Sequence, residues 1–147
     1  MGIVVAATHL QLGQRVAIKF LLENATKETI SRFIREARAA VRLRSEHTAR
    51  VLDVGDLPSG APYMVMEYLE GNDLSHLVRS HGALPVADAV LSVLHTCAAM
   101  AEAHSIGIIH LDLKPANLFL TRGADGSLTI KVLDFGISKS LFKRRFR

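Results

Sequence analysis

Three side chains of different chemistry stand close together in the segment His110-Leu111-Asp112-Leu113-Lys114-Pro115-Ala116-Asn117. Asp112 supplies a carboxylate, Lys114 an ammonium group and Asn117 an amide. Phosphoryl transfer needs a carboxylate to orient and deprotonate the acceptor hydroxyl, positive charge beside the moving group, and hard oxygen ligands for magnesium. The segment therefore indicates phosphoryl transfer, and Asp134-Phe135-Gly136 follows it with a further carboxylate.

Together these two segments resemble the catalytic and metal-binding loops of the protein kinase family. The Lys114-Pro115 pair in the first segment is similar to serine/threonine kinases. The sequence Pro115-Ala116-Asn117 is similar to the eukaryotic-like kinases of bacteria. The resemblance implies that Asp112 is the catalytic base, that Lys114 stabilises the γ-phosphate, and that Asn117 and Asp134 hold Mg²⁺. The expected reaction is ATP-dependent phosphorylation of Ser or Thr hydroxyls on a protein substrate.

A lysine and a glutamate nearer the N-terminus extend this resemblance. Val16-Ala17-Ile18-Lys19 is similar to the third-strand motif of the family, whose lysine contacts the α- and β-phosphates of ATP. Glu36 stands beside the apolar stripe of a predicted helix, where it matches the glutamate that pairs with that lysine. The alternatives are a solvated Lys19 and a surface salt bridge between Glu36 and Arg32.

The segment from Met64 to Gly71 resembles the fifth strand and hinge of the family. There, the backbones of Glu67 and Leu69 would bind the adenine edge and Met66 would be the gatekeeper. The resemblance also implies that Val4, Ala17 and Phe119 enclose the adenine ring. It further implies that Asp73 lies near the ribose and Gly2 near the phosphates. Each of the three adenine contacts could equally be an ordinary core residue, and Asp73 could instead cap a helix.

Hydrophobic periodicity indicates strands first and then mostly helices. Strands are expected at 3–8, 15–22, 51–57 and 63–68, with one helix from Thr26 to about Arg44 among them. A short helix from Asp73, a long helix over 85–103 with apolar residues around most of its circumference, and brief strands at 108–109, 118–121 and 129–133 follow. This order predicts an α+β, two-lobed, protein-kinase-like fold, with 1–69 as N-lobe and hinge and 70–147 as a partial C-lobe ending in the activation loop.

Composition excludes several other classes of function. The net charge of +4 disappears when Lys143, Arg144, Arg145 and Arg147 are set aside (+4 − 4 = 0), so nucleic-acid binding is not expected. Cys97 is the single cysteine, which favours a cytoplasmic location. No apolar run of roughly 20 residues for a membrane span is apparent, and the histidines lack metal-ligand spacing. His110 is expected to pack beneath Asp-Phe-Gly.

The sequence departs from the family pattern in three places. The glycine-rich loop is reduced to Gly2, leucine stands at Leu111 where many relatives have an arginine, and only 137–147 follow Asp-Phe-Gly. These departures predict a domain truncated at both ends, weakly active at best, with an exposed apolar face on the long helix that favours self-association. A non-catalytic remnant that binds nucleotide or a protein partner is the main alternative. A small-molecule phosphotransferase is a third reading, against which Lys114 and Asp-Phe-Gly argue.

Overall fold

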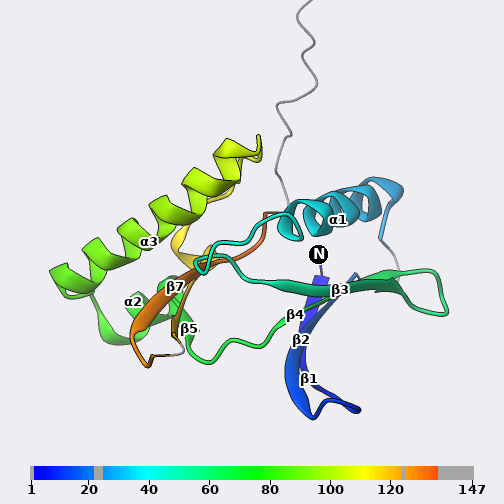
Figure 1. The fold of residues 1–147 in the computed structure, drawn as a ribbon, viewed down its shortest axis with the longest axis horizontal. Helices are drawn as coiled ribbons and strands as arrows, with labels where there is room; N and C mark the ends of the chain where they lie inside the picture. The colour runs from blue at the N-terminus through cyan, green and yellow to red at the C-terminus, as the bar shows by residue number, and fades with distance from the viewer. Residues whose placement is uncertain (1, 22–24, 124, 136–147) are drawn as a thin grey trace, which may run out of the picture.

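A computed structural model describes residues 2–21, 25–123 and 125–135. The described chain forms two lobes joined by the linker after β4 (Figure 1). The predictions that concern Gly136, the segment 137–147 and its basic residues lie outside the described residues.

The first lobe contains a four-stranded antiparallel sheet in the order β1-β2-β4-β3. Its strands are β1 (Gly2–His9), β2 (Gln14–Leu21), β3 (Val51–Asp56) and β4 (Pro62–Glu67). All four agree with the predicted strands to within about one residue at each end. In the register of the sheet, Lys19 lies opposite Val4 on one side and Met64 on the other, two residues before the end of β2.

Helix α1 (Lys27–Ala40) covers one face of this sheet. It begins where predicted, because the side chain of Thr26 accepts a hydrogen bond from the backbone N–H of Thr29 at 3.2 Å and so caps the first turn. It ends at Ala40 and not near Arg44. The N–H groups of Arg44 and Ser45 bond instead to the carboxylate of Glu102 at 2.8 Å each, which draws the chain away from the helix axis.

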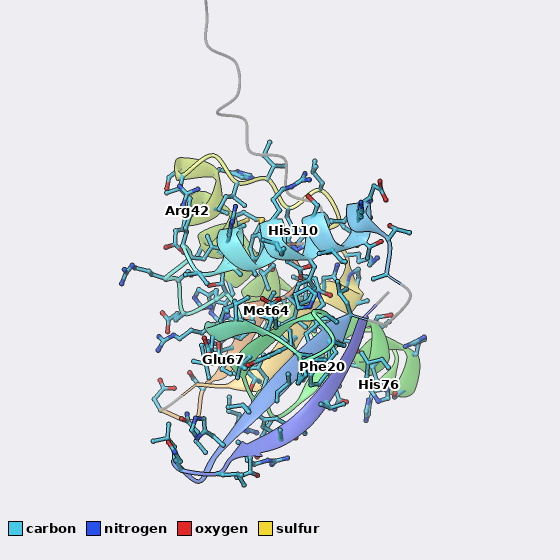
Figure 2. The ribbon with its side chains drawn as sticks, turned by 90° about the vertical axis from the view of Figure 1, so that its right-hand side faces the viewer. Phe20, Arg42, Met64, Glu67, His76 and His110 are labelled. Atoms are coloured by element: carbon cyan, nitrogen blue, oxygen red, sulfur yellow. The ribbon has the colours of Figure 1, made fainter. Side chains whose placement is uncertain are left out.

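Two apolar clusters hold α1 in place. The first joins Phe33 and Ala37 of the helix to Leu21 and Met64 of the sheet. Figure 2 shows Met64, which is 1% exposed, beneath the helix. The second cluster belongs to both lobes, since Ala39 and Leu43 pack with residues of the second lobe, namely Ala99, Ala103, Ile108, Val132 and Phe135. The C-terminal end of α1 is therefore anchored to the lobe that carries the catalytic loop.

The second lobe combines two α-helices with a small antiparallel sheet in the order β5-β6-β7. Its elements are β5 (Asn72–Asp73), α2 (Leu74–His81), α3 (Val86–Ser105), a 3₁₀ turn (Pro115–Asn117), β6 (Leu118–Arg122) and β7 (Leu128–Val132). The sequence did not indicate β5, because two residues are too few for a pattern. Asp73 caps α2 by accepting the N–H of His76 at 2.8 Å.

The strand predicted at Ile108–Ile109 is wrong. The N–H of Ile108 bonds to the carbonyl of Ala103 at 2.8 Å, and that of Gly107 bonds to His104 at 3.0 Å. Gly107 has φ of 76°, so these bonds form the left-handed turn that commonly ends a helix. The backbone donor that a strand would have used is thus consumed by the C-terminus of α3.

Apolar residues around most of the circumference of α3 would suggest burial on several sides, but the helix is buried on one face only. Its inward face carries small or hydroxylated residues (Ser92, Thr96, Ala99 and Ala103), and the hydroxyls of Ser92 and Thr96 bond back to carbonyls one turn earlier at 2.7 Å. Four large apolar residues face outward, with exposed fractions of 80% for Val86, 52% for Val90, 61% for Val93 and 59% for Leu94. The exposed apolar face that was expected on this helix is confirmed.

By length and composition alone, α3 could cross a membrane, with a mean hydropathy of 1.3 over its most apolar 18 residues. The expectation that no apolar segment is long enough to span a membrane is therefore corrected. A core helix of a soluble protein passes the same test, and α3 contacts β7.

Candidate active site

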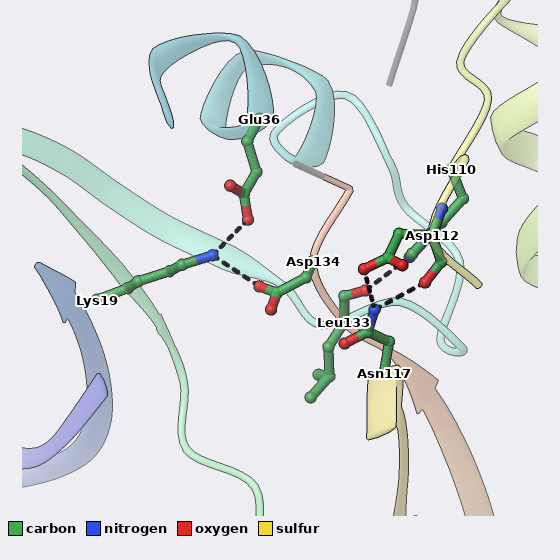
Figure 3. A network of polar contacts seen from close by, with 7 residues as sticks. All are labelled: Lys19, Glu36, His110, Asp112, Asn117, Leu133 and Asp134. Atoms are coloured by element: carbon green, nitrogen blue, oxygen red, sulfur yellow. Dashed lines mark hydrogen bonds and ion pairs between the residues drawn. The ribbon is translucent and has the colours of Figure 1, made fainter. Parts of the chain in front are cut away.

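Lys19 lies at the centre of a three-residue charged cluster. Its Nζ is 2.6 Å from Oε1 of Glu36 on α1 and 2.7 Å from Oδ1 of Asp134 after β7 (Figure 3). The side chains of Lys19 and Glu36 are only 13% and 10% exposed. The alternatives of a solvated Lys19 and a surface pairing of Glu36 with Arg32 do not occur, because both charges are turned into the space between the lobes.

The charges of this cluster depend on one another. Burial by itself would lower the pKa of Lys19, but the carboxylates of Asp134 and Glu36 outweigh it and raise that pKa. Burial raises the pKa of Glu36, against the opposing effect of Lys19. Asp134 has φ of 54°, a left-handed conformation that is uncommon outside glycine. The structure thus uses an unfavourable backbone conformation at the residue whose carboxylate reaches Lys19.

The predicted catalytic loop forms a second polar cluster. Lys114 Nζ lies 2.9 Å from Oδ2 of Asp112, and the Asn117 amide donates to the Asp112 carbonyl at 2.8 Å and to Oδ2 at 3.3 Å. Chiefly because of the hydrogen bond from Lys114, the pKa of Asp112 is below its usual value. Leu111, which precedes it, has φ of 61° and is 52% exposed. The loop therefore presents an ionised carboxylate with a cation beside it.

His110 joins the two clusters. It is 2% exposed, and its ring lies 4.9 Å from that of Phe135, so the expected packing beneath Asp-Phe-Gly is confirmed for the described part of that motif. Its Nδ1 accepts the Asp112 N–H at 3.3 Å, which leaves Nε2 to donate to the Leu133 carbonyl at 2.8 Å. Figure 3 shows the bond between His110 and Leu133 beside the bonds from Asn117 to Asp112. The N–H of Leu133 also donates to the Asn117 carbonyl at 2.9 Å, which links the catalytic loop to the residue before Asp134.

An apolar cavity of about 240 Å³ lies between the lobes beside these clusters. It is lined by the residues expected around adenine, namely Val4, Ala17, Met66, Glu67, Leu69 and Phe119. Glu36 and Asp134 also line it, so it opens onto the charged cluster. A larger groove of about 710 Å³ lies across the linker and is lined largely by polar residues, away from Lys19.

Three of the expected nucleotide contacts, Gly2, Lys19 and Asp73, are not among the lining residues. Lys19 instead contacts Glu36 and Asp134, which do line the cavity. Gly2 pairs with Leu21 in the sheet, where a Cβ atom would come within 2.6 Å of the Phe20 carbonyl oxygen, so a close strand approach explains the glycine. Asp73 is engaged as the cap of α2, which was the alternative role for it. Among the described residues, no group of three or more His, Cys, Asp or Glu is arranged to hold a metal ion.

Sequence reasoning missed the contacts that hold the linker. Glu67 accepts from the Arg50 N–H at 2.7 Å and from Lys131 Nζ at 2.9 Å, and Lys131 comes from β7. The Arg15 guanidinium lies 3.7 Å from the centre of the Tyr68 ring. These partners are 17, 64 and 53 positions apart in the sequence, so no local pattern marks them.

The family profile described as "Protein kinase domain" matches residues 1–146. This chain belongs to the protein kinase family. The kinase domain is 42% identical over 142 residues to serine/threonine-protein kinase Pkn1 of Myxococcus xanthus, covering 95% of this chain and 20% of the relative. It is 38% identical over 141 residues to serine/threonine-protein kinase pkn3 of the same organism, covering 95% and 26%.

Serine/threonine-protein kinase PknK of Mycobacterium tuberculosis is 36% identical over 139 residues, covering 94% of this chain and 12% of the relative. The chain thus spans about a fifth of the length of the most similar of these curated relatives. These matches confirm the resemblance to bacterial-type serine/threonine kinases and the kinase-like fold class.

Proposed function

We propose that this chain is the catalytic part of an ATP-dependent protein serine/threonine kinase, with 1–69 as N-lobe and hinge and 70–147 as part of the C-lobe. The observation that carries the proposal is the position of Lys19 Nζ, within 2.7 Å of a carboxylate from α1 and of another from the segment after β7. A buried ammonium group that joins the two lobes in this way suits the phosphates of a nucleotide bound between them. Kinase membership and the names of the relatives support the same reading.

Asp112 is the proposed base for the acceptor hydroxyl. Its pKa lies below the ordinary value, chiefly because of the hydrogen bond from Lys114, so the carboxylate is ionised at neutral pH and can accept a proton. Lys114 is 53% exposed, which leaves it room to turn from Asp112 toward the γ-phosphate. The proton moves from the Ser or Thr hydroxyl to Asp112 while the hydroxyl oxygen bonds to phosphorus and the bond to ADP breaks.

The donor set around Asn117 and Asp134 fits Mg²⁺, which usually takes one or two carboxylates together with phosphate oxygens. The Asn117 amide nitrogen is committed to Asp112, which turns its oxygen to the role of ligand. Asp134 uses Oδ1 for Lys19, so Oδ2 is its second oxygen. When bound, the ion supplies positive charge to the phosphates.

The apolar cavity is the proposed adenine site. Its walls come from both lobes, through Val4 and Ala17 above and Phe119 below. The Glu67 N–H already donates to the Arg50 carbonyl at 2.9 Å, which leaves the Glu67 carbonyl for the adenine amino group. The backbone of Leu69, one residue beyond Tyr68, is the other proposed hinge contact.

A second candidate function is that of a non-catalytic kinase domain that binds nucleotide or a protein partner. The outward apolar face of α3 favours it, since exposed apolar patches of this kind commonly mark contact surfaces. Self-association through this face belongs to the same proposal. A cytoplasmic location stays a prediction.

Radiolabelled phosphate transfer from ATP to a generic basic protein separates the two functions. We expect wild-type chain to transfer phosphate to Ser or Thr and Asp112→Asn to lose about 10²–10⁴-fold in rate, the usual contribution of a general base. Asp56→Asn, at the exposed end of β3, is the matched control and should keep the wild-type rate. If wild type and Asp112→Asn give the same background transfer while both bind ATP, the non-catalytic function is correct.

A further inference from the structure

A pair of stacked histidines lies away from the proposed catalytic residues, on the outer edge of β7. His47, from the segment between α1 and β3, and His95, from α3, have ring centres 4.1 Å apart with their planes inclined by 17°. His47 Nδ1 lies 3.2 Å from the Ile130 carbonyl oxygen, and the Ile130 N–H donates to His95 Nδ1 at 3.2 Å. Two imidazoles from separate elements thus bind the two polar backbone groups of one strand residue.

These contacts define the proton positions on both rings. A carbonyl oxygen can only accept, so His47 carries its proton on Nδ1. The Ile130 N–H can only donate, so Nδ1 of His95 is bare and His95 is neutral with its proton on Nε2. A protonated His95 would have no acceptor at Nδ1 and would place a second N–H against that of Ile130.

The two histidines supply the hydrogen bonds that the outer edge of β7 lacks from other backbone groups at Ile130. Two residues further along β7, the Val132 N–H donates to the His47 carbonyl at 2.8 Å and the Val132 carbonyl accepts from Ala49 at 3.1 Å. At Ile130, which is 1% exposed, the same edge is bound by the histidine side chains instead. The pair therefore attaches α3 and the segment after α1 to the strand that leads into Asp134.

Few other charges act on this pair. Glu46 is the nearest, with Oε1 3.9 Å from His47 Nε2. On the other neighbouring elements, Glu102 of α3 is committed to the N–H groups of Arg44 and Ser45, and Lys131 of β7 is committed to Glu67. Burial, and then the positive charge of a protonated His47, lower the pKa of His95, with Glu46 opposing them.

We propose that His47 and His95 form a pH-sensitive clamp, in which protonation of His95 releases the Ile130 N–H and loosens β7 from α3 and from the segment after α1. The inference goes beyond the proposed kinase activity and does not depend on it. Since the pKa of His95 is lower in the folded protein than in the unfolded chain, its contribution to stability is complete above about pH 6.5 and is lost as pH falls through the folded pKa.

Long-range ¹H–¹⁵N spectra of the histidine rings in the full chain test the clamp directly. At about pH 7.5, His95 should show the Nε2–H tautomer and His47 the Nδ1–H tautomer. On acidification, His95 should titrate below the ordinary histidine pKa of about 6.5, and the Ile130 amide signal should shift with the His95 midpoint. An Nδ1–H tautomer at His95, or a His95 midpoint at or above that ordinary value, would overturn the proposal.

A variant separates titration from the hydrogen bond itself. His95→Asn offers a side-chain oxygen near the position of Nδ1 and does not titrate, so the fall in Tm between about pH 7.5 and about pH 5.5 should be smaller than in wild type. His104→Asn is the matched control and should retain the wild-type fall. Equal falls in wild type and His95→Asn would contradict the clamp.

Discussion

The charged cluster between the lobes and the outer face of α3 differ in how their side chains are satisfied. In the cluster, Lys19, Glu36 and Asp134 are bonded to one another across three elements, and the two most buried of them are 13% and 10% exposed. On α3, Val93 and Leu94 are about 60% exposed and face away from β7. The charged side chains of the site are thus paired with one another within the described chain. The apolar side chains on the outer face of α3 lack such contacts within the described chain, so this face is the surface suited to a further contact.

The largest effect on stability is expected at Glu36. Glu36→Ala removes one partner of a buried ion pair, which typically costs about 3 kcal/mol or more in the free energy of unfolding, and Asp134 remains to limit the loss. Urea titration of the full chain measures the change. Glu28→Gln, in the exposed first turn of α1, is the control and should leave stability close to that of wild type. Equal losses in the two variants would show that the cluster does not stabilise the fold.

The two faces of α3 should respond differently to substitution. Ala99 is fully buried against β7 and its neighbours, so Ala99→Leu should destabilise the chain by about 1–3 kcal/mol through overpacking. Val93→Ser on the outer face should change stability by less than about 0.5 kcal/mol. Sedimentation should also show weaker self-association for Val93→Ser than for wild type. A large loss of monomer stability in Val93→Ser would mean that the outer face is packed within the chain.

The smallest effect concerns the titration of Asp112. Because the Lys114 hydrogen bond is the chief cause that lowers the pKa of Asp112, carboxyl NMR should place that pKa below 3.8, and Lys114→Met should raise it toward the ordinary value. A lowered carboxyl pKa adds stability that is present above about pH 3.8 and is lost as pH falls through the folded pKa. An unchanged Asp112 titration in Lys114→Met would refute the role of this contact.

The sequence predicts the N-lobe strands well, because they are runs rich in Val, Ile, Ala and Leu separated by turn residues. The start of α1 at Thr26 and the start of α2 at Asp73 are also predicted, and both residues cap their helices. It also predicts the Lys19–Glu36 pair, although the two residues are 17 positions apart, through the resemblance of two separate motifs to one family. The same local rules fail at Ile108, where a left-handed turn at Gly107 consumes the N–H that would pair in a strand.

Other features of the structure depend on contacts that local patterns do not encode. The Glu102 carboxylate accepts the N–H groups of Arg44 and Ser45, which are 58 and 57 positions away in the sequence. These bonds fix the segment after α1, and the helix ends at Ala40, earlier than periodicity suggests. The apolar residues of α3 do not by themselves show which side of the helix packs against the rest of the chain. The described lobe instead turns the small residues Ala99 and Ala103 inward.

Calorimetry of ATP·Mg²⁺ binding tests the central claim, that Lys19 is the phosphate contact of a kinase nucleotide site. We expect measurable binding to wild type and a loss of about tenfold or more in affinity for Lys19→Met, since hydrogen bonds to charged groups are worth about 1.5–3 kcal/mol. Lys27→Met, at the exposed start of α1, is the matched control and should bind as wild type does. Equal affinities for wild type and Lys19→Met would contradict the account.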